Sequence, residues 1–106
     1  LELHTFSSLN PAFLPEYKGT LADADVAIIY LSEHARAIKR MDKIEAETVQ
    51  TYFNHPNLIV LREQAELKEY LLKQNQENQN LLMMSSGTFD GLDFPGLASE
   101  LGLRIQ

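Results

Sequence analysis

Val26-Ala-Ile-Ile-Tyr-Leu31 is an apolar run without a charged residue, and two more runs of this kind follow it. They are Leu58-Ile-Val-Leu61 and Leu81-Leu-Met-Met84, and none of the three alternates between apolar and polar residues. Strands that are apolar on both faces are typical of a sheet covered on both sides, where helical crossovers join parallel strands. The three runs therefore predict buried strands of an α/β fold.

The stretches between these runs have the length and the apolar spacing of crossover helices. The predicted helices cover about 14–23, 45–54, 63–73 and 95–101. A strand-like stretch at Leu1–Phe6 precedes them, so the order is β-α-β-α-β-α-β-α. This order predicts a Rossmann-like open, mostly parallel sheet with helices on both faces, in a single domain over residues 1–106. Because Leu1 already lies in a strand-like stretch, we expect a fragment of a larger protein.

The composition excludes several classes of protein. Cysteine is absent, which rules out disulfide scaffolds, thiolate metal sites and cysteine nucleophiles. The formal net charge is −6, which repels nucleic acid and anionic lipid. The sequence has neither an apolar run near the roughly 18 residues of a membrane span nor a secretory signal pattern. We therefore expect a cytoplasmic protein whose partners include no nucleic acid and no membrane.

The loops that follow the predicted strands are the candidate site, because ligands of open parallel sheets bind beyond the carboxyl ends of the strands. Three of the four loops begin with a serine. The four loops begin with Ser7-Ser8-Leu9-Asn10, Ser32-Glu33-His34, Arg62-Glu63 and Ser85-Ser86-Gly87-Thr88.

The Ser85–Gly91 loop is the most suggestive of the four. It offers hydroxyl groups, backbone N–H groups and two glycines that let a ligand approach the main chain. Two interpretations stay open: the loop binds a carboxylate or phosphate, or its serines and glycines only connect a strand to a helix. The sequence contains neither a P-loop nor a Gly-x-Gly-x-x-Gly pattern, so nucleotide binding by this domain alone is not supported.

Other polar residues give weaker signals. None of the three histidines has the spacing of a metal site. His34 follows a predicted strand, which makes it either a ligand contact or an exposed loop histidine. Arg36, Lys39 and Arg40 form a basic cluster that either meets an anion or is a solvated face. No Gly-x-Ser-x-Gly elbow supports a hydrolase, and no aspartate stands where a phospho-receiver domain needs one.

Two segments resemble the C-terminal domain of Mur ligases. Leu3-His-Thr-Phe-Ser-Ser-Leu-Asn-Pro-Ala-Phe-Leu-Pro-Glu-Tyr-Lys-Gly-Thr-Leu-Ala-Asp-Ala-Asp-Val26 resembles its strand, helix and "ADAD" strand entry. Leu82-Met-Met-Ser-Ser-Gly-Thr-Phe-Asp-Gly-Leu92 resembles the strand and the Ser-Asn-Gly-Gly-Phe-Gly-Gly type loop of one branch. That branch contains UDP-N-acetylmuramate–alanine ligase and the murein tripeptide ligase. The two segments have the right order and spacing.

The resemblance implies the substrate-binding and closing domain of a three-domain, ATP-dependent, ADP-forming amide ligase of bacterial peptidoglycan synthesis or recycling. Such an enzyme uses ATP and Mg²⁺ to phosphorylate the carboxylate of a UDP-N-acetylmuramate substrate, and an amino acid or murein peptide then displaces the phosphate. The resemblance places the following residues near the incoming amine or in the loop after the first strand: Ser85, Ser86, Gly87, Thr88, Phe89, Ser7, Ser8 and Asn10.

The sequence departs from the family pattern in ways that limit this interpretation. The loop Ser7–Asn10 lacks the arginine usual in this branch. We therefore expect other residues to recognise the substrate carboxylate. The Asp-Asp-Tyr-Ala-His-His-Pro segment and the Gly-Lys-Thr loop of the central domain are also missing. We therefore expect the chain to need the missing N-terminal and central domains, and by itself to hold no cofactor, metal or catalytic residue. The alternative is a free-standing Rossmann-like binding or regulatory module for a small anionic metabolite.

Overall fold

The computed structural model describes residues 1–74 and 77–102, and a two-stranded parallel sheet lies at their centre. Strand β1 (Ala27–Tyr30) pairs with β2 (Leu58–Leu61), in a register that runs from Ala27 opposite Leu58 to Tyr30 opposite Leu61. Isoleucine, valine and tyrosine favour such a pleated, buried surface. The structure thus confirms strands in two of the three apolar runs and the parallel α/β character of the domain.

The first three residues continue this sheet along the free side of β1. Leu1 N donates to Ile28 O at 2.9 Å, and Leu3 N donates to Tyr30 O at 3.0 Å. Glu2 forms a parallel bridge with Tyr30. The predicted strand Leu1–Phe6 is too long, because Thr5 begins a turn in which its carbonyl accepts from Leu9 N at 3.0 Å.

The predicted strand Leu81–Met84 has no strand pairing in the described part of the chain. One backbone hydrogen bond, from Glu2 N to Met84 O at 2.9 Å, joins it to the edge of the sheet. Its side chains also differ from those of a buried strand, since Leu82 is 71% exposed. The sequence predicts burial there from apolar character alone, whereas Leu81 and Met84 are each 37% exposed and Met83 is partly buried.

Three of the predicted helices are confirmed to within one residue at each end: α2 (Ala46–Phe53), α3 (Gln64–Leu72) and α4 (Phe94–Leu101). The predicted helix at 14–23 is wrong beyond its first turn, which is the 3-10 helix η1 (Leu14–Tyr17). Gly19 has a φ of 74°, and its N–H donates to Phe53 O at 3.3 Å, so the chain turns toward α2. A positive φ is easy for glycine and incompatible with a continuing α-helix.

Helix α1 (Glu33–Lys39) follows β1 and was not predicted. Ser32 is its N-cap, with Oγ accepting from Ala35 N at 2.9 Å. Arg40 ends it in the left-handed conformation, with a φ of 53°. The apolar pattern of the sequence was too weak to predict this helix, since Ala35 is its sole buried residue and Ile38 is 66% exposed.

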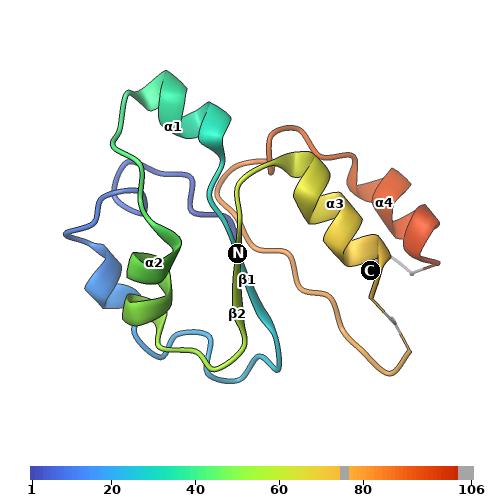
Figure 1. The fold of residues 1–106 in the computed structure, drawn as a ribbon. Helices are drawn as coiled ribbons and strands as arrows, with labels where there is room; N and C mark the ends of the chain where they lie inside the picture. Colours follow the sequence, from blue (N-terminus) through green and yellow to red (C-terminus); the bar gives the residue numbers. More distant parts are fainter. Residues whose placement is uncertain (75–76, 103–106) are drawn as a thin grey trace.

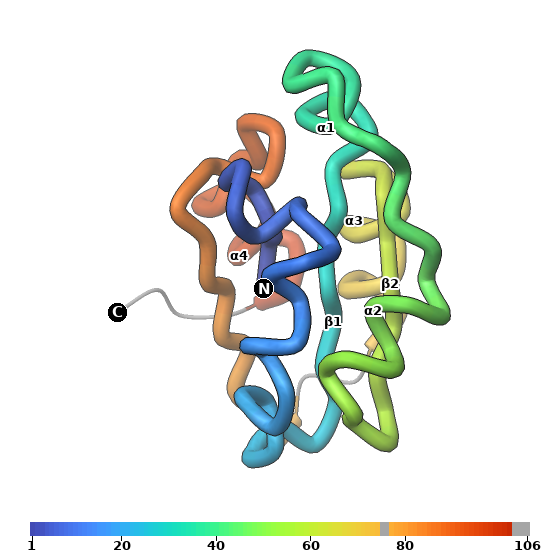
Figure 2. Tube along the Cα trace, turned by 90° about the vertical axis from the view of Figure 1, so that its left-hand side faces the viewer, coloured from blue at the N-terminus to red at the C-terminus, as the bar shows by residue number. Residues whose placement is uncertain are grey.

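Side chains of β1 point alternately into two hydrophobic clusters, one on each face of the sheet. Ile29 and Leu31 pack with Val49 and Phe53 of α2, whereas Tyr30 packs with residues of α3 and α4. Figures 1 and 2 show the two layers, with α2 on one side of β1 and β2 and with α3 on the other. Within the described ranges, no helix is long and apolar enough to cross a bilayer.

Candidate functional site

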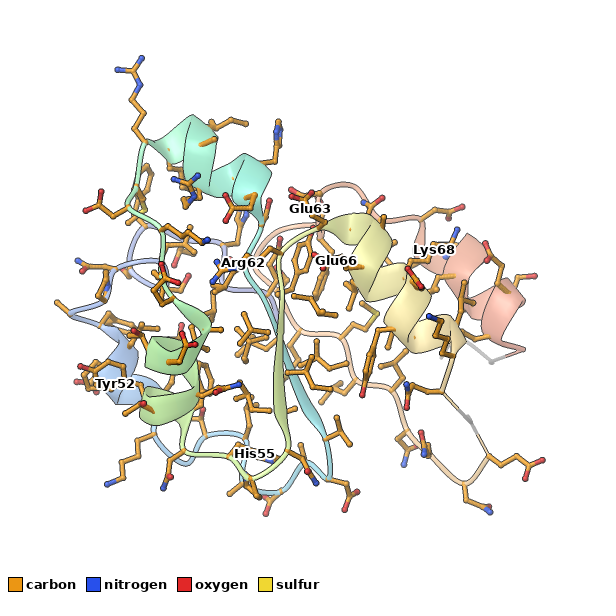
Figure 3. The ribbon with its side chains drawn as sticks, viewed as in Figure 1. Tyr52, His55, Arg62, Glu63, Glu66 and Lys68 are labelled. Carbon is orange, nitrogen blue, oxygen red and sulfur yellow. The ribbon has the colours of Figure 1, made fainter. Side chains whose placement is uncertain are left out.

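The loops that follow the strands meet at one end of the molecule, the upper end in Figures 1 and 2, where the strands have their carboxyl ends. Helix α1, the start of α3 and the Ser85–Gly91 loop all lie there. Figure 3 shows Arg62 and Glu63 at this end and His55 at the opposite end. The parallel arrangement therefore brings together the polar loops that topology predicts as a site.

A buried carboxylate from the first strand holds the Ser85–Gly91 loop. The Glu2 side chain has no exposed surface, and its Oε1 accepts from Ser85 Oγ at 2.5 Å and from Phe89 N at 3.0 Å. Ser85 Oγ in turn accepts from Gly87 N at 2.7 Å. Because a carboxylate that accepts hydrogen bonds replaces part of its lost hydration, these contacts let Glu2 be buried.

The other oxygen of Glu2 faces a histidine. His4 Nδ1 lies 4.0 Å from Glu2 Oε2, and both atoms are buried without a hydrogen-bond partner among the described residues. Residues two apart in an extended segment point to the same side, which is why these two side chains meet. The rest of the His4 side chain is partly open, with 37% of its surface exposed.

Gly87 lies so close to this pair that no larger residue fits. A Cβ atom at Gly87 would lie 2.8 Å from His4 Cγ and 3.0 Å from Glu2 Oε1. Contacts this short require the histidine or the loop to move. The glycine is therefore needed for close approach of the loop to His4, and its φ is not in the left-handed region.

A second network holds the far end of the loop. Asp90 accepts from Tyr30 Oη at 2.5 Å and from Ser32 Oγ at 2.8 Å. Burial, followed by the hydrogen bond to Asp90 and the negative charges around it, raises the pKa of the Tyr30 phenol far above its ordinary value. Tyr30 therefore stays a hydrogen-bond donor, and the sheet holds Asp90 in place.

The backbone at Phe89 and Asp90 adopts a conformation that ordinary residues rarely take, with φ values of 51° and 57°. Gln64, in the first turn of α3, donates from Nε2 to Phe89 O at 3.0 Å and to Asp90 O at 2.9 Å. Left-handed conformations of this kind persist where surrounding contacts determine them, and they are common at functional sites. Three separate segments thus impose one shape on the loop.

Two basic side chains at this end, Arg36 and Arg62, are paired with Glu33, and Lys39 Nζ lies 5.5 Å from the centre of the Phe6 ring. Glu33 Oε2 accepts from Arg36 Nε at 3.0 Å, and Arg62 Nη1 lies 3.6 Å from Glu33 Oε1. Both arginines also donate to backbone carbonyls, Arg36 to Met41 O and Arg62 to Ile44 O. These contacts brace the segment between α1 and α2. The charged groups that hold the Ser85–Gly91 loop are therefore the carboxylates of Glu2 and Asp90.

The predicted site residues divide into supporting and accessible groups. Phe89 is buried in the cluster with Tyr30, and Ser8 is buried with its Oγ donating to Thr5 O at 3.1 Å. Ser85 and Gly87 are partly buried through their contacts with Glu2. The exposed members are Ser86, Thr88, Ser7, Asn10 and His34, the last in the first turn of α1.

Sequence reasoning gave no supporting role to Glu2, His4, Tyr30 and Gln64, and it named Ser32 and Asp90 only as members of the loops after the strands. One signal for the first two was present, since acidic Glu2 and polar His4 share one face of an otherwise apolar strand. The others bond to loop residues 25–60 positions away, and no local pattern encodes such contacts.

An open groove of about 790 Å³ lies on the α3 side of the sheet. Its apolar lining includes Val26, Ile28, Leu71 and Leu82, and its rim includes Asp23 and Asp25 ahead of β1. The groove extends toward the amino ends of the strands. Its lining also contains polar residues, among them Thr20, Gln74, Asn78 and Asn80.

The loop does not fit a nucleotide phosphate. The N–H groups of Gly87 and Phe89, which would bind a phosphate, already donate to Ser85 and Glu2, and the buried Glu2 carboxylate would repel an anion. The described residues also contain no group of three or more side chains suited to a metal ion. We therefore assign no step to ATP or Mg²⁺ on this chain.

Comparison with family models, curated proteins and solved structures found no match to the chain.

Proposed function

We propose that this chain is the substrate-binding and closing domain of a Mur-type ligase, an ATP-dependent enzyme that joins an amino acid or murein peptide to UDP-N-acetylmuramate. We also propose that its parallel strands belong to a Rossmann-like open sheet. The resemblance of the Leu3–Val26 and Leu82–Leu92 segments motivates both proposals.

The observation that carries the proposal is the fixed shape of the Ser85–Gly91 loop. Glu2, the Tyr30–Ser32 pair and Gln64 hold it from three directions at the carboxyl ends of the strands. A binding loop with supporting contacts loses little entropy when it meets a ligand. Ser86 and Thr88 remain exposed on it, so its hydroxyl groups are available to a substrate.

The charges around the loop favour an amine over an anion. Glu2 and Asp90 contribute carboxylates, while Arg36 and Arg62 are paired with Glu33. An ammonium group gains from nearby carboxylates, and an isolated phosphate or carboxylate does not. This argues against the alternative module for a small anionic metabolite. The same charges support the proposal that the Ser85–Gly91 loop forms one wall of the pocket that receives the incoming amine.

A titration tests the proposal. Murein tripeptide is added to the ¹⁵N-labelled chain, and we expect the backbone amides of residues 85–91 to shift, with a weaker response to L-alanine. Ser86→Ala should weaken the response several-fold, whereas the exposed Ser99→Ala on α4 serves as a matched control and should leave it unchanged. Unchanged amides in the loop at millimolar tripeptide would contradict the proposed role.

A further inference from the structure

We infer that His4, held by Glu2, accepts a hydrogen bond and then a proton from the primary ammonium group of the ligand. This inference rests on the proposed function, because it names the group that meets the amine in that site. His4 belongs to none of the four loops identified from the sequence. Its role follows from its position between a buried carboxylate and the Ser85–Gly91 loop.

The buried side of the His4 ring faces the carboxylate of Glu2. Nδ1 of His4 and Oε2 of Glu2 are each buried, each lacks a partner in the described chain, and they face each other at 4.0 Å. A hydrogen bond requires them to be about 1 Å closer, and such contacts at functional sites are often long before a ligand binds. A proton on Nδ1 satisfies both atoms at once, because Nδ1 then donates and the carboxylate accepts.

The His4 ring also has an open side. With Nδ1 buried and the Cγ–Cδ2 edge against Gly87, the exposed part of His4 is its Cε1–Nε2 edge. When Nδ1 carries the proton of a neutral imidazole, Nε2 is an acceptor. An acceptor beside the exposed Ser86 and Thr88 matches a ligand that donates N–H groups.

The chemistry that follows is a balanced proton transfer. The ligand ammonium donates an N–H to Nε2, and the N–H bond breaks as the proton moves to the imidazole. The products are a neutral amine, whose lone pair can form a bond to carbon, and an imidazolium ion beside Glu2. The buried carboxylate stabilises that positive charge. Glu2 therefore acts as a positioning residue through its effect on His4.

The tautomer of His4 tests the first half of the inference without any ligand. Long-range ¹H–¹⁵N spectra of the chain should show neutral His4 protonated on Nδ1. In Glu2→Gln the side chain keeps an oxygen for Ser85 and Phe89 N, but its amide donates to Nδ1, so the proton should move to Nε2. A wild-type His4 protonated on Nε2 would overturn the inference.

His55 provides an internal reference in the same spectra. Its Nδ1 accepts from Asn57 N at 3.0 Å and its Nε2 lies 2.7 Å from Ala24 O, which requires a proton on Nε2. The His55 resonances should report that tautomer in both proteins. A different His55 tautomer in Glu2→Gln would show that the substitution changes the structure generally. In that case Glu2→Asp, which keeps the carboxylate, is the deciding variant. Its His4 should be protonated on Nδ1, as in the wild type, and protonation on Nε2 would overturn the inference.

The amine itself tests the second half. Murein tripeptide should shift the His4 ring resonances, and the same tripeptide acetylated on the amino group of its N-terminal alanine should not. Shifts in residues 85–91 with no response at His4, or an equal response to both peptides, would overturn the inference and leave the proposed function in place. Absence of any response to the tripeptide would overturn the proposed function and the role of His4 with it.

Discussion

At the scale of single residues, the Ser85–Gly91 loop depends on the close approach of Gly87 to the Glu2–His4 pair. The loop passes His4 at a distance that leaves no room for a methyl group. Substituents forced into such a space typically cost about 1–3 kcal/mol because side chains or backbone must shift.

Gly87→Ala should therefore lower the free energy of unfolding by about 1–3 kcal/mol. Urea denaturation measures this change, and the neighbouring exposed Ser86→Ala is the matched control, expected within about 0.5 kcal/mol of the wild type. Equal stability of Gly87→Ala and Ser86→Ala would show that the close approach does not exist in solution.

Tyr30 provides a second test at this scale. Removing its hydroxyl group in Tyr30→Phe breaks one hydrogen bond to a carboxylate, which should cost about 1–3 kcal/mol. Asp90 keeps its bond from Ser32 Oγ, so the loss should be partial. Denaturant unfolding of the two proteins at neutral pH measures it.

The same hydroxyl group predicts how stability depends on alkaline pH. The pKa of Tyr30 is raised in the folded chain, above the value of about 10 expected when it is unfolded. Its contribution is therefore full below about pH 10 and is lost as pH rises toward the folded pKa, because the unfolded state loses the proton first. Unfolding free energies measured from pH 8 to pH 11 should decline above pH 10, and less steeply in Tyr30→Phe. Identical declines in the two proteins would contradict this assignment.

At the scale of elements, two helices end on residues other than glycine in the left-handed conformation. Arg40 ends α1 with a φ of 53°, and Asn54 ends α2 with a φ of 52°. Glycine takes this conformation without steric cost, and asparagine tolerates it better than arginine does.

Arg40→Gly should therefore stabilise the chain by up to about 1 kcal/mol, and Asn54→Gly by less. Thermal unfolding measures both, with a gain of several degrees expected for the first. A larger gain from Asn54→Gly, or destabilisation by Arg40→Gly, would mean that the two helix ends differ from the structure described.

The elements also show what local sequence patterns can and cannot predict. The helices α2, α3 and α4 have apolar stripes, and the sequence predicts them to within a residue. Helix α1 depends on Ser32 as its N-cap and buries little apolar surface, so its apolar pattern was too weak to predict a helix. At 14–23 the spacing was helical, but the backbone contact between Gly19 and Phe53 redirected the chain. A local cap decided the first case, and a tertiary contact decided the second.

The candidate site likewise has features that the sequence predicts and features that it does not. Topology alone predicts that the loops after Leu1–Leu3, β1 and β2 lie at one end of the sheet. The chemistry at that end depends on pairs far apart in the sequence, such as Glu2 with Ser85 and Tyr30 with Asp90. The sequence thus predicted which loops lie together, and the structure shows which carboxylates and which histidine lie beside them.

At the scale of the whole molecule, the two ends of the sheet carry different side chains. The carboxyl ends carry a fixed loop with carboxylates and His4, whereas the apolar groove extends toward the amino ends. We propose that a charged amine is recognised at the first end, because His4 there combines an exposed edge with a buried carboxylate behind it.

Mapping the amide shifts caused by murein tripeptide over the whole chain is the most direct test of this claim. We predict that the shifts concentrate at residues 85–91 and around His4, and that residues of the groove such as Ile28, Leu71 and Leu82 stay unchanged. Shifts concentrated in the groove, with the Ser85–Gly91 loop silent, would contradict the account.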